Sequence, residues 1–240
     1  MTTAKTANTT AKRGRPSRIN REAIARAALA IGLDKVTIPA LAAHLQIDHS
    51  SLYHHIKGRD DVLTLAAELA VTELAWQAPA SADWQQQLIA LTDAIWLLYE
   101  SNPGLAECFH QAEVSPTVGI RAFAQSVASL QQQGFRLDDA VLAVDMLVDM
   151  VQACFVGWWS ASKQDGDGTL RKDRMMALWQ AEAAACPELA SQINSMVGIM
   201  QAGARRWWEQ KRDVVLAGIA SRRQLEQPHE MAAPQSAAPS

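Results

Sequence analysis

Apolar residues recur along this chain at intervals of three and four positions, which is the spacing of one face of an α-helix. The first such stripe runs from Ile24 to Ile31, between Asn20, a suitable N-cap, and Gly32, a common helix stop. No window alternates between apolar and polar residues with period two, and Gly (12 residues) and Pro (9 residues) are scarce. The pattern therefore predicts an all-α protein.

Two short helices are predicted directly after the first one. Thr37 is a candidate N-cap for a stripe that extends from Ile38 to Leu45. After residues 46–48, the segment HSSLYHHIK predicts a third, very short helix that buries Leu52 and Ile56. Its outer face then carries hydrogen-bonding side chains: His49, Ser50, Ser51, Tyr53, His54 and His55.

This arrangement indicates a helix-turn-helix, in which the second short helix presents a polar face to DNA. Ser, Tyr and His can form hydrogen bonds with base edges or phosphates. The alternative is that these are ordinary surface residues of a helical domain. Such a surface more often carries Glu and Lys, and this face has neither.

The rest of the chain predicts a larger helical body. Apolar stripes indicate helices over residues 60–76, 83–100, 116–134, 137–160 and about 203–223, with a break at Asn102-Pro103-Gly104. The helix over 137–160 has two apolar rows, so it needs two partners, one of which can belong to another chain. Together with residues 203–223, it predicts a homodimer held by a four-helix interface.

Charge separates the two parts of the chain. Residues 1–59 contain ten Lys or Arg and three acidic residues, whereas residues 60–240 contain twelve bases and 22 acids. A basic head on an acidic body suggests that the head meets a polyanion. We expect a flexible basic arm over residues 1–19, a helix-turn-helix domain over 20–65, a ligand-binding and dimerisation domain over 66–225, and a disordered tail over 226–240.

The arm contains the segment KRGRPSR at residues 12–18. Gly14 allows the backbone to lie close to the floor of a DNA minor groove, and Pro16 reduces the entropy that is lost on ordering. Arg side chains are attracted by the negative potential there, so we expect contacts from the arm's arginines Arg13, Arg15 and Arg18. The alternative is a disordered basic tail that adds only non-specific attraction.

The segment TIPALAAHLQIDHSSLYHHIKGRDDVL resembles the DNA-binding segment of the tetracycline-repressor (TetR) family of bacterial transcription regulators. Weaker similarity to the ligand-binding half of that family continues through ESNPGLAECF and LQQQGFRLDDAVLAVDMLVDMVQACFVGWW. The resemblance implies a cytoplasmic homodimer that binds a palindromic operator, acts as a repressor and is released by a small molecule. Its four-helix interface would be the one expected above.

The same resemblance implies roles for residues of the head. His49, Ser50 and Ser51 would face bases. Tyr53, His54, His55 and Lys57 would contact bases or backbone, and Arg59 would hold a phosphate at the start of the fourth helix. The family commonly has Thr, Arg or Lys early in the second helix, where this chain has Ile38-Pro39-Ala40, which leaves Thr37 as the polar group there.

Candidate ligand contacts lie in the body. Asp145 and Asp149 stand four residues apart in an apolar helix, so one of them could orient a cationic or hydroxylated ligand. They could equally lie at a wet groove edge or pair with Arg across a dimer. The candidate cavity walls, which could also be ordinary core, are Trp84, Trp96, Phe109, His110, Cys154, Trp158 and Trp159.

Other classes of protein find less support. Three cysteines at unpatterned spacings suit a reducing cytoplasm, and no uninterrupted apolar run approaches the roughly 18 residues of a membrane span. No catalytic triad, Cys/His pair or phosphate-binding Gly loop stands out, so we expect neither an enzyme nor a cofactor or metal site. Two alternatives stay open: a ligand-independent DNA-binding adaptor whose bundle binds another protein, and a helical-bundle enzyme.

Overall fold

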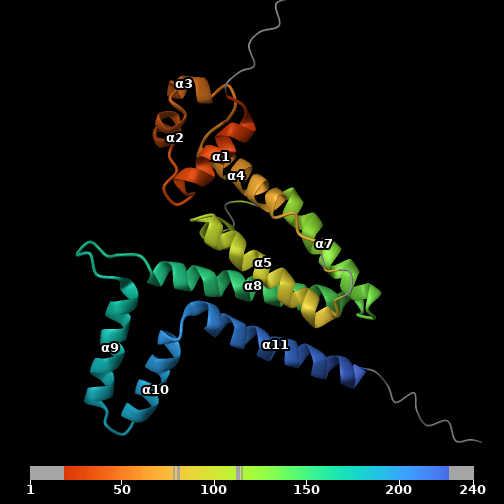
Figure 1. Cartoon of the computed structure of the whole chain (residues 1–240), viewed down its shortest axis with the longest axis vertical. Coiled ribbons are helices and arrows are strands. Elements are labelled where there is room, and N and C mark those ends of the chain that lie inside the picture. Colours follow the sequence, from red (N-terminus) through yellow and green to blue (C-terminus); the bar gives the residue numbers. More distant parts are fainter. Residues whose placement is uncertain (1–18, 78, 80–81, 112–113, 115, 227–240) are drawn as a thin grey trace, which may run out of the picture.

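The computed structural model describes residues 19–77, 79, 82–111, 114 and 116–226 of the chain. Within these residues it is built from eleven α-helices, which confirms the all-α prediction (Figure 1). In chain order they are α1 (Arg21–Ile31), α2 (Ile38–Leu45), α3 (His49–Leu52), α4 (Arg59–Leu74), α5 (Trp84–Ser101), α6 (Leu105–His110), α7 (Thr117–Gln132), α8 (Leu137–Ala161), α9 (Arg171–Ala185), α10 (Ala190–Gln201) and α11 (Ala204–Glu226).

The head consists of α1, α2, α3 and the first half of α4. Its predicted caps are confirmed, because the side chains of Asn20 and Thr37 accept hydrogen bonds from the third residue of α1 and α2, respectively. Gly32 ends α1 with a φ of 92°, a value that glycine adopts at little cost. Leu52 and Ile56 are buried as predicted, at 0% and 3% exposure.

The helix α4 belongs to both parts of the molecule. It packs closely against α1 in the head and against α7 and α5 in the body. The boundary that we expected between residues 65 and 66 therefore lies inside an unbroken helix, next to the fully buried Ala66 and Ala67. The first half of α4 thus belongs to the head and its second half to the body.

The body is formed by α5, α7, α8 and α11, with the short α6 against α8. The helix α8 is its centre. The sequence spacing predicts one continuous apolar row on this helix, made of Leu137, Val141, Val144, Val148, Val151, Phe155 and Trp158, and the structure buries only part of that row. Leu137, Val141 and Trp158 of the predicted row are 54%, 39% and 38% exposed. The buried face instead consists of Ala140, Ala143, Val144, Leu147, Val151 and Phe155.

An exposed apolar strip runs along the outside of the body. It includes Leu142 and Met146 of α8, with 41% and 39% exposure, and Val214 of α11, with 73% exposure. Single exposed apolar residues are ordinary on a protein surface, but a group of them on two neighbouring helices is typical of an interface.

Among the described residues, α8 is also the one helix whose length and mean hydropathy, 1.8 over its most apolar window, would suit a membrane span. Asp145 and Asp149 interrupt the run of apolar residues in this helix, so a search of the sequence for long uninterrupted apolar runs does not find it. The helix packs against α5, α7, α6 and α11, so its inner face forms the centre of the folded body.

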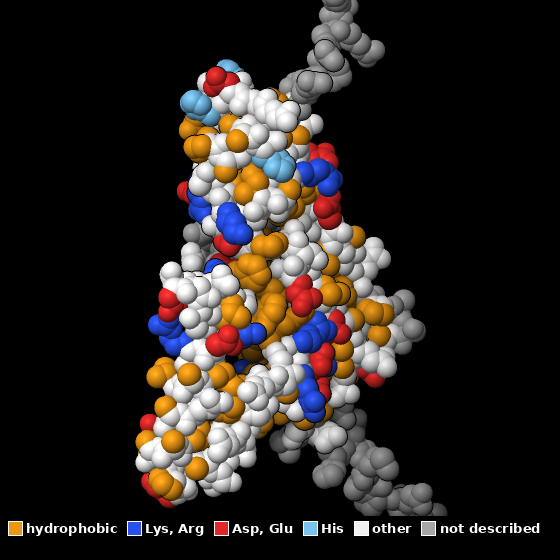
Figure 2. All heavy atoms as spheres, turned by 60° about the vertical axis from the view of Figure 1, so that its left-hand side comes forward, with side chains coloured by type: hydrophobic (Ala, Val, Ile, Leu, Met, Phe, Trp, Pro, Cys, Tyr) orange, Lys and Arg blue, Asp and Glu red, His pale blue; other side chains and the backbone are white. Residues whose placement is uncertain are grey.

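The helices α9 and α10 form a hairpin that projects from the body (Figure 1). Ala183 and Val197 are the residues buried within it. Several apolar side chains are exposed on its surface, where Figure 2 shows them scattered among polar atoms in its lower part; they include Met175, Leu178, Met196 and Ile199. The loop before α9 forms a tight turn in which Arg171 and Arg174 pair with Asp165.

Candidate functional site

The outer end of the head is formed by α3 and the residues that follow it. Asp48 caps α3 by accepting a hydrogen bond from the Ser50 backbone N–H at 3.0 Å. That hydrogen bond, together with one from the Ser50 hydroxyl, holds the pKa of Asp48 below its ordinary value. Buried Leu52 and Ile56 fix the opposite side, so the polar face of α3 is held outward.

Most of the predicted DNA-contacting residues lie on this outer face. His49, Ser50, Tyr53, His54 and Lys57 are exposed, with Tyr53 at 55%. Ser51 and His55 are half-buried. Figure 2 shows histidine side chains gathered at the outer end of the head. The His49 imidazole lies 3.5 Å from the Asp48 carboxylate, so an acidic group lies beside this polar face.

The structure holds this face on α4 through Arg21. Its guanidinium donates to the His55 carbonyl at 2.7 Å and pairs with Asp61 of α4 at 2.8 Å. The Asp61 carboxylate also accepts the Lys57 backbone N–H at 3.1 Å. The far end of the segment after α3, at His55 and Lys57, is therefore held against α1 and α4 by one ion pair.

Two predicted contacts have other roles in the free protein. The Arg59 guanidinium donates to the carbonyls of Val36 and Leu33, at 3.3 and 3.4 Å, and so ties the α1–α2 loop to α4. The Thr37 hydroxyl oxygen accepts the Ala40 backbone N–H at 3.2 Å. A phosphate contact from Arg59 stays a prediction, and it would compete with these hydrogen bonds. The arm residues Arg13, Arg15 and Arg18 lie outside the described residues.

A second candidate site is an aromatic cluster inside the body. The Phe155 ring lies at its centre, 5.2 Å from Trp96, 5.4 Å from Trp158 and 6.4 Å from Trp159. Tyr99 lies 5.4 Å from Phe155 and joins it to Phe109 of α6, whose ring lies 6.2 Å from that of Tyr99. The cluster therefore brings together four of the predicted cavity walls, Trp96, Phe109, Trp158 and Trp159.

Charged groups surround this cluster. Lys163 lies 5.8 Å above the Trp159 ring and pairs with Glu107 of α6 at 3.0 Å. The Arg205 guanidinium lies 5.4 Å from the Trp96 ring. Burial raises the pKa of the Tyr99 hydroxyl well above its ordinary value, and the nearby negative charge of Asp149 raises it further.

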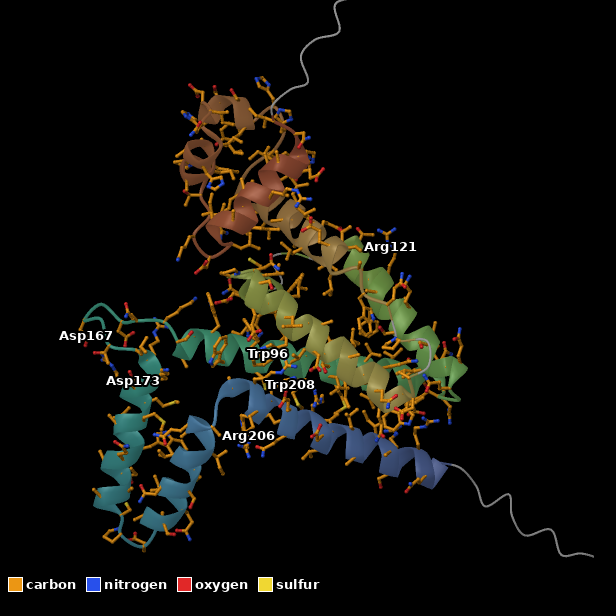
Figure 3. All side chains as sticks on the ribbon, in the orientation of Figure 1. Trp96, Arg121, Asp167, Asp173, Arg206 and Trp208 are labelled. Atoms are coloured by element: carbon orange, nitrogen blue, oxygen red, sulfur yellow. The ribbon has the colours of Figure 1, made fainter. Side chains whose placement is uncertain are left out.

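Three buried polar atoms have no hydrogen-bond partner within the described part of the chain. They are the indole N–H groups of Trp159 and Trp208 and the second carboxylate oxygen of Glu107. Trp159 and Glu107 both contact Lys163, and Trp208 lies one turn after Arg205 on α11. Figure 3 shows the labelled Trp96 and Trp208 where α5, α8 and α11 meet. Buried donors and acceptors of this kind are usually satisfied, so these atoms are places where a bound molecule could form hydrogen bonds.

The other predicted ligand contacts lie apart from this cluster. Trp84 begins α5 and packs edge-on against Phe135, with centroids 5.4 Å apart. Its position is about 18 Å from Trp96 along the helix axis. His110 and Asp145 are exposed, while Cys154 is half-buried with its sulfur 3.6 Å from Lys211 Nζ.

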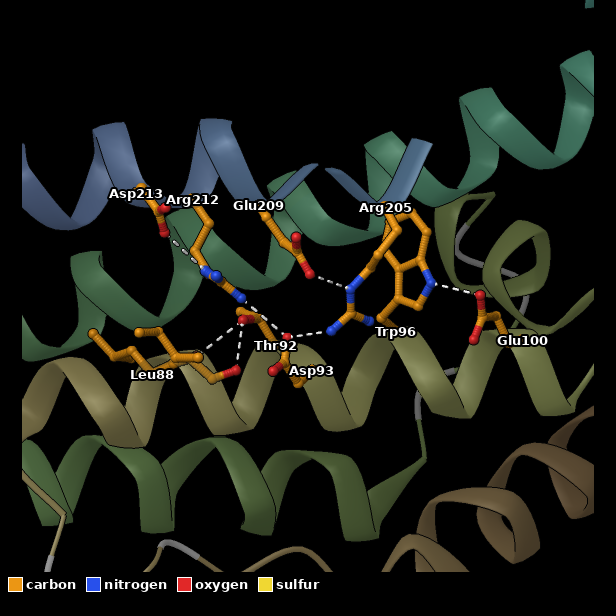
Figure 4. Close-up of polar contacts among 10 residues, drawn as sticks. Leu88, Thr92, Asp93, Trp96, Glu100, Arg205, Glu209, Arg212 and Asp213 are labelled. Atoms are coloured by element: carbon orange, nitrogen blue, oxygen red, sulfur yellow. Dashed lines mark hydrogen bonds and ion pairs between the residues drawn. The ribbon is translucent and has the colours of Figure 1, made fainter. Parts of the chain in front are cut away.

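A network of ion pairs joins α5 to α11 within the body (Figure 4). Asp93 of α5 pairs with Arg205 at 2.6 Å and with Arg212 at 3.0 Å, both from α11. The Arg212 side chain is only 10% exposed and also pairs with Asp213 at 3.3 Å. The Trp96 indole N–H donates to Glu100 at 2.8 Å, which fixes the orientation of the ring in the aromatic cluster.

Sequence reasoning missed several of these residues. Phe155 was assigned only to an apolar row, and Tyr99 and Glu107 were not selected at all. Glu107 and Lys163 are 56 positions apart, so no local pattern could have paired them. Within the described residues, no cluster of three or more His, Cys, Asp or Glu could hold a metal ion.

Comparisons with known proteins cover both parts of the chain. Residues 78–223, which make up more than half of it, match the family model described as "Tetracyclin repressor-like, C-terminal domain". The HTH-type transcriptional repressor Rv1353c of Mycobacterium tuberculosis is 26% identical over 116 residues, which is 46% of this chain and 44% of that protein. An HTH-type transcriptional regulator of Saccharopolyspora erythraea is 29% identical over 115 residues, 47% of this chain and 48% of that protein. The chain thus aligns with less than half the length of these curated relatives.

Solved structures show the same fold over most of the chain. A possible TetR family transcriptional regulator from Streptomyces coelicolor A3(2) has a TM-score of 0.71 at 22% identity, covering 85% of this chain and 100% of that one. The TetR family protein ActR from Streptomyces coelicolor, in complex with actinorhodin, has a TM-score of 0.68 at 20% identity, covering 85% and 96%.

Proposed function

Because the chain belongs to the tetracycline-repressor family, we propose that it is a cytoplasmic, dimeric transcriptional repressor that binds a palindromic operator and is released by a small molecule. The observation that carries this proposal is the outer face of α3, where Tyr53 and the neighbouring histidines are held outward by buried Leu52 and Ile56. A helix of this kind, presented by a basic head, suits the DNA major groove.

The dimer is supported by the exposed apolar strip on α8 and α11. Leu142, Met146 and Val214 would be covered if the same two helices of a second copy packed against them. Such an interface is self-complementary, as a twofold dimer requires. It would place two heads at a fixed separation, which matches the spacing of half-sites in a palindrome.

The aromatic cluster supports a ligand site in the body. Its rings offer flat apolar surfaces, and the unpaired indole N–H groups of Trp159 and Trp208 offer donors to a hydroxyl or carbonyl oxygen. ActR, which shares this fold, was solved with actinorhodin bound. We infer a small molecule with oxygen acceptors, which must bind the DNA-incompetent state more tightly than the competent one to cause release.

The DNA-binding proposal is tested by selection from a pool of random duplexes. The full-length protein should enrich a palindromic sequence, and affinity for the selected duplex is then measured by fluorescence anisotropy. Tyr53→Ala should weaken binding by about tenfold or more, since one good base or phosphate contact contributes about 1–3 kcal/mol. Leu178→Ala is the matched control, because this side chain is even more exposed, at 67%, but lies on α9. Failure to enrich any sequence would contradict the proposal.

The alternative of a ligand-independent adaptor is supported by the apolar surface of the α9–α10 hairpin. Tryptophan fluorescence separates the two functions, because Trp96, Trp158 and Trp159 lie in the proposed ligand site. A sensor should show saturable quenching by some member of a metabolite panel, and the same compound should release the selected duplex. An adaptor should show neither effect.

A further inference from the structure

The carboxylate of Glu107, on α6, is only half satisfied within the protein. One of its oxygens, Oε1, accepts a hydrogen bond from the Lys163 ammonium at 3.0 Å. The other, Oε2, is buried and has no hydrogen-bond partner among the residues that the structure describes. An ionised carboxylate can accept several hydrogen bonds, and a buried charged oxygen that receives none is costly. A bound molecule that donates a hydrogen bond would remove this cost.

A buried donor that needs an acceptor lies next to the same ammonium group. Lys163 Nζ is 5.8 Å from the centre of the Trp159 ring. The Trp159 indole N–H is buried and also has no partner within the described part of the chain. This donor and the Glu107 oxygen are complementary, yet they do not bond to each other. A molecule that bound both would need an acceptor for the indole and a donor for the carboxylate.

The walls around these two groups are flat and apolar. The Trp159 ring stacks on Phe155, with 16° between the ring planes and centroids 6.4 Å apart. Phe109 of α6 packs against Tyr99, whose ring contacts Phe155 in turn. The Lys163 side chain is 39% exposed, so the site reaches the surface beside its ammonium group. Flat rings with a few fixed polar groups are typical of sites for planar small molecules.

Charge balance at this site favours an uncharged ligand. The Lys163 ammonium neutralises the Glu107 carboxylate, so the pair carries no net charge. Arg205, another cation beside the cluster, is neutralised by Asp93 and Glu209, at 2.6 and 3.0 Å. A cationic ligand would compete with Lys163 for the carboxylate, and an anionic ligand would be repelled by it. A neutral hydroxyl or N–H group can donate to Oε2 without disturbing the ion pair.

We propose that Glu107 selects the ligand of the body by accepting a hydrogen bond from it, and that this ligand is an uncharged planar compound with a hydroxyl or N–H donor. An oxygen acceptor on the same compound receives the Trp159 indole N–H. Lys163 is a positioning residue, because it occupies Oε1 and leaves Oε2 as the acceptor for the ligand. The inference rests on the proposed function, since it gives the chemical class of ligand for that site.

The test uses planar probes that share a ring carbonyl and differ in the donor. One series is umbelliferone, which has a hydroxyl group, its methyl ether, and unsubstituted coumarin. The other is a hydroxyxanthone with the methoxyxanthone substituted at the same ring position. Binding to the full-length parent protein is measured by calorimetry at about pH 6, where the phenols are uncharged. We expect each hydroxyl probe to bind about tenfold or more tightly than the probes without a donor, which leave Oε2 unpaired.

Replacement of Glu107 by Gln should abolish or reverse this preference. Lys163 can only donate, so it keeps the amide oxygen and leaves the amide NH2 at the position of Oε2. The acceptor there becomes a donor, and Glu107→Gln should bind the methyl ethers at least as tightly as the phenols. Glu100→Gln is the matched control, because Glu100 also accepts a hydrogen bond beside the cluster, from Trp96 at 2.8 Å, but it is exposed. The control should keep the preference of the parent.

Equal binding of hydroxyl probes and methyl ethers by the parent would overturn the inference, and so would a lack of binding by every hydroxyl probe. Neither result depends on how a variant folds. A preference that persists in folded Glu107→Gln would also overturn it, because another group or a bound water would then accept the hydrogen bond. The probe measurements need no DNA. A parent that prefers the hydroxyl probes but selects no duplex would therefore refute the proposed function alone.

Discussion

Replacement of Asp93 by Asn should destabilise the body, because it neutralises a carboxylate that two arginines share. Asp93 is the shared carboxylate between Arg205 and Arg212, at 2.6 and 3.0 Å. The Arg212 side chain is 10% exposed, so its charge has little access to water when Asp93 is neutralised. Among the described residues, the ion pair that then remains to Arg212 is the longer contact with Asp213, at 3.3 Å.

The size of the effect follows from burial. Removing one partner of a fully buried ion pair costs about 3–5 kcal/mol, and hydrogen bonds to charged groups contribute about 1.5–3 kcal/mol. Asp93 is 37% exposed, so water partly screens the pair. We therefore expect a loss of about 2–3 kcal/mol in the free energy of unfolding, or roughly 5–10 °C in melting temperature for a chain of this size.

The assay is urea unfolding followed by circular dichroism, at one fixed protein concentration because dimerisation affects apparent stability. Glu22→Gln is the matched control. It also converts an acid to an amide in an ion pair of 3.0 Å with Arg26, but both side chains are more than half exposed. The control should cost less than about 0.5 kcal/mol. Equal losses for Asp93→Asn and Glu22→Gln would refute the argument that burial of Arg212 sets the cost.

Three further predictions concern the proposed DNA binding and dimer. Deleting residues 1–18 should weaken binding of the selected duplex and make its salt dependence less steep, because fewer counterions are released; an unchanged slope would leave the arm without a role. At least one histidine of the α3 segment should contribute to affinity, because each imidazole can form a hydrogen bond with a base edge or a phosphate. At least one of His49→Ala, His54→Ala and His55→Ala should weaken binding of the selected duplex by about tenfold, and an unchanged affinity in all three variants would contradict the idea. Val214→Asp should give monomers in sedimentation equilibrium, because Val214 is 73% exposed on the proposed interface and does not contribute to the core of its own chain; a dimer that persists would place the interface elsewhere.

Local features of the head could be predicted because their causes are local. The Asn20 and Thr37 caps depend on backbone groups three residues away, and the inward position of Leu52 follows from helix spacing alone. The role of Arg59 could not be predicted in this way. Its carbonyl partners are 23 and 26 positions distant, and a cation at a helix start fits phosphate binding equally well.

In the body, the spacing of apolar residues along a helix does not predict which of them are buried. Leu147 and Met146 are neighbouring apolar residues of α8, and packing against α5, α7 and α11 decides that Leu147 is buried while Met146 is 39% exposed. Clustering of Trp96 with Trp158 depends on how α5 crosses α8, which no pattern within either helix encodes. Whether position 104, a glycine, could carry a side chain likewise depends on backbone 70 positions earlier, at Asp34, which a Cβ there would overlap.

The position of α11 at the end of the sequence has a consequence for how the chain is made. Trp208 and Leu216 of α11 cover part of α8, yet translation reaches α11 only after the α9–α10 hairpin has been synthesised. At elongation rates of about 5–20 residues per second, the roughly 40 intervening residues correspond to about 2–8 seconds. During that interval the most membrane-like helix of the nascent chain lacks the last helix that shields it. A stop codon at any position before residue 204 should therefore yield a chain that aggregates or is degraded, rather than a shorter working protein.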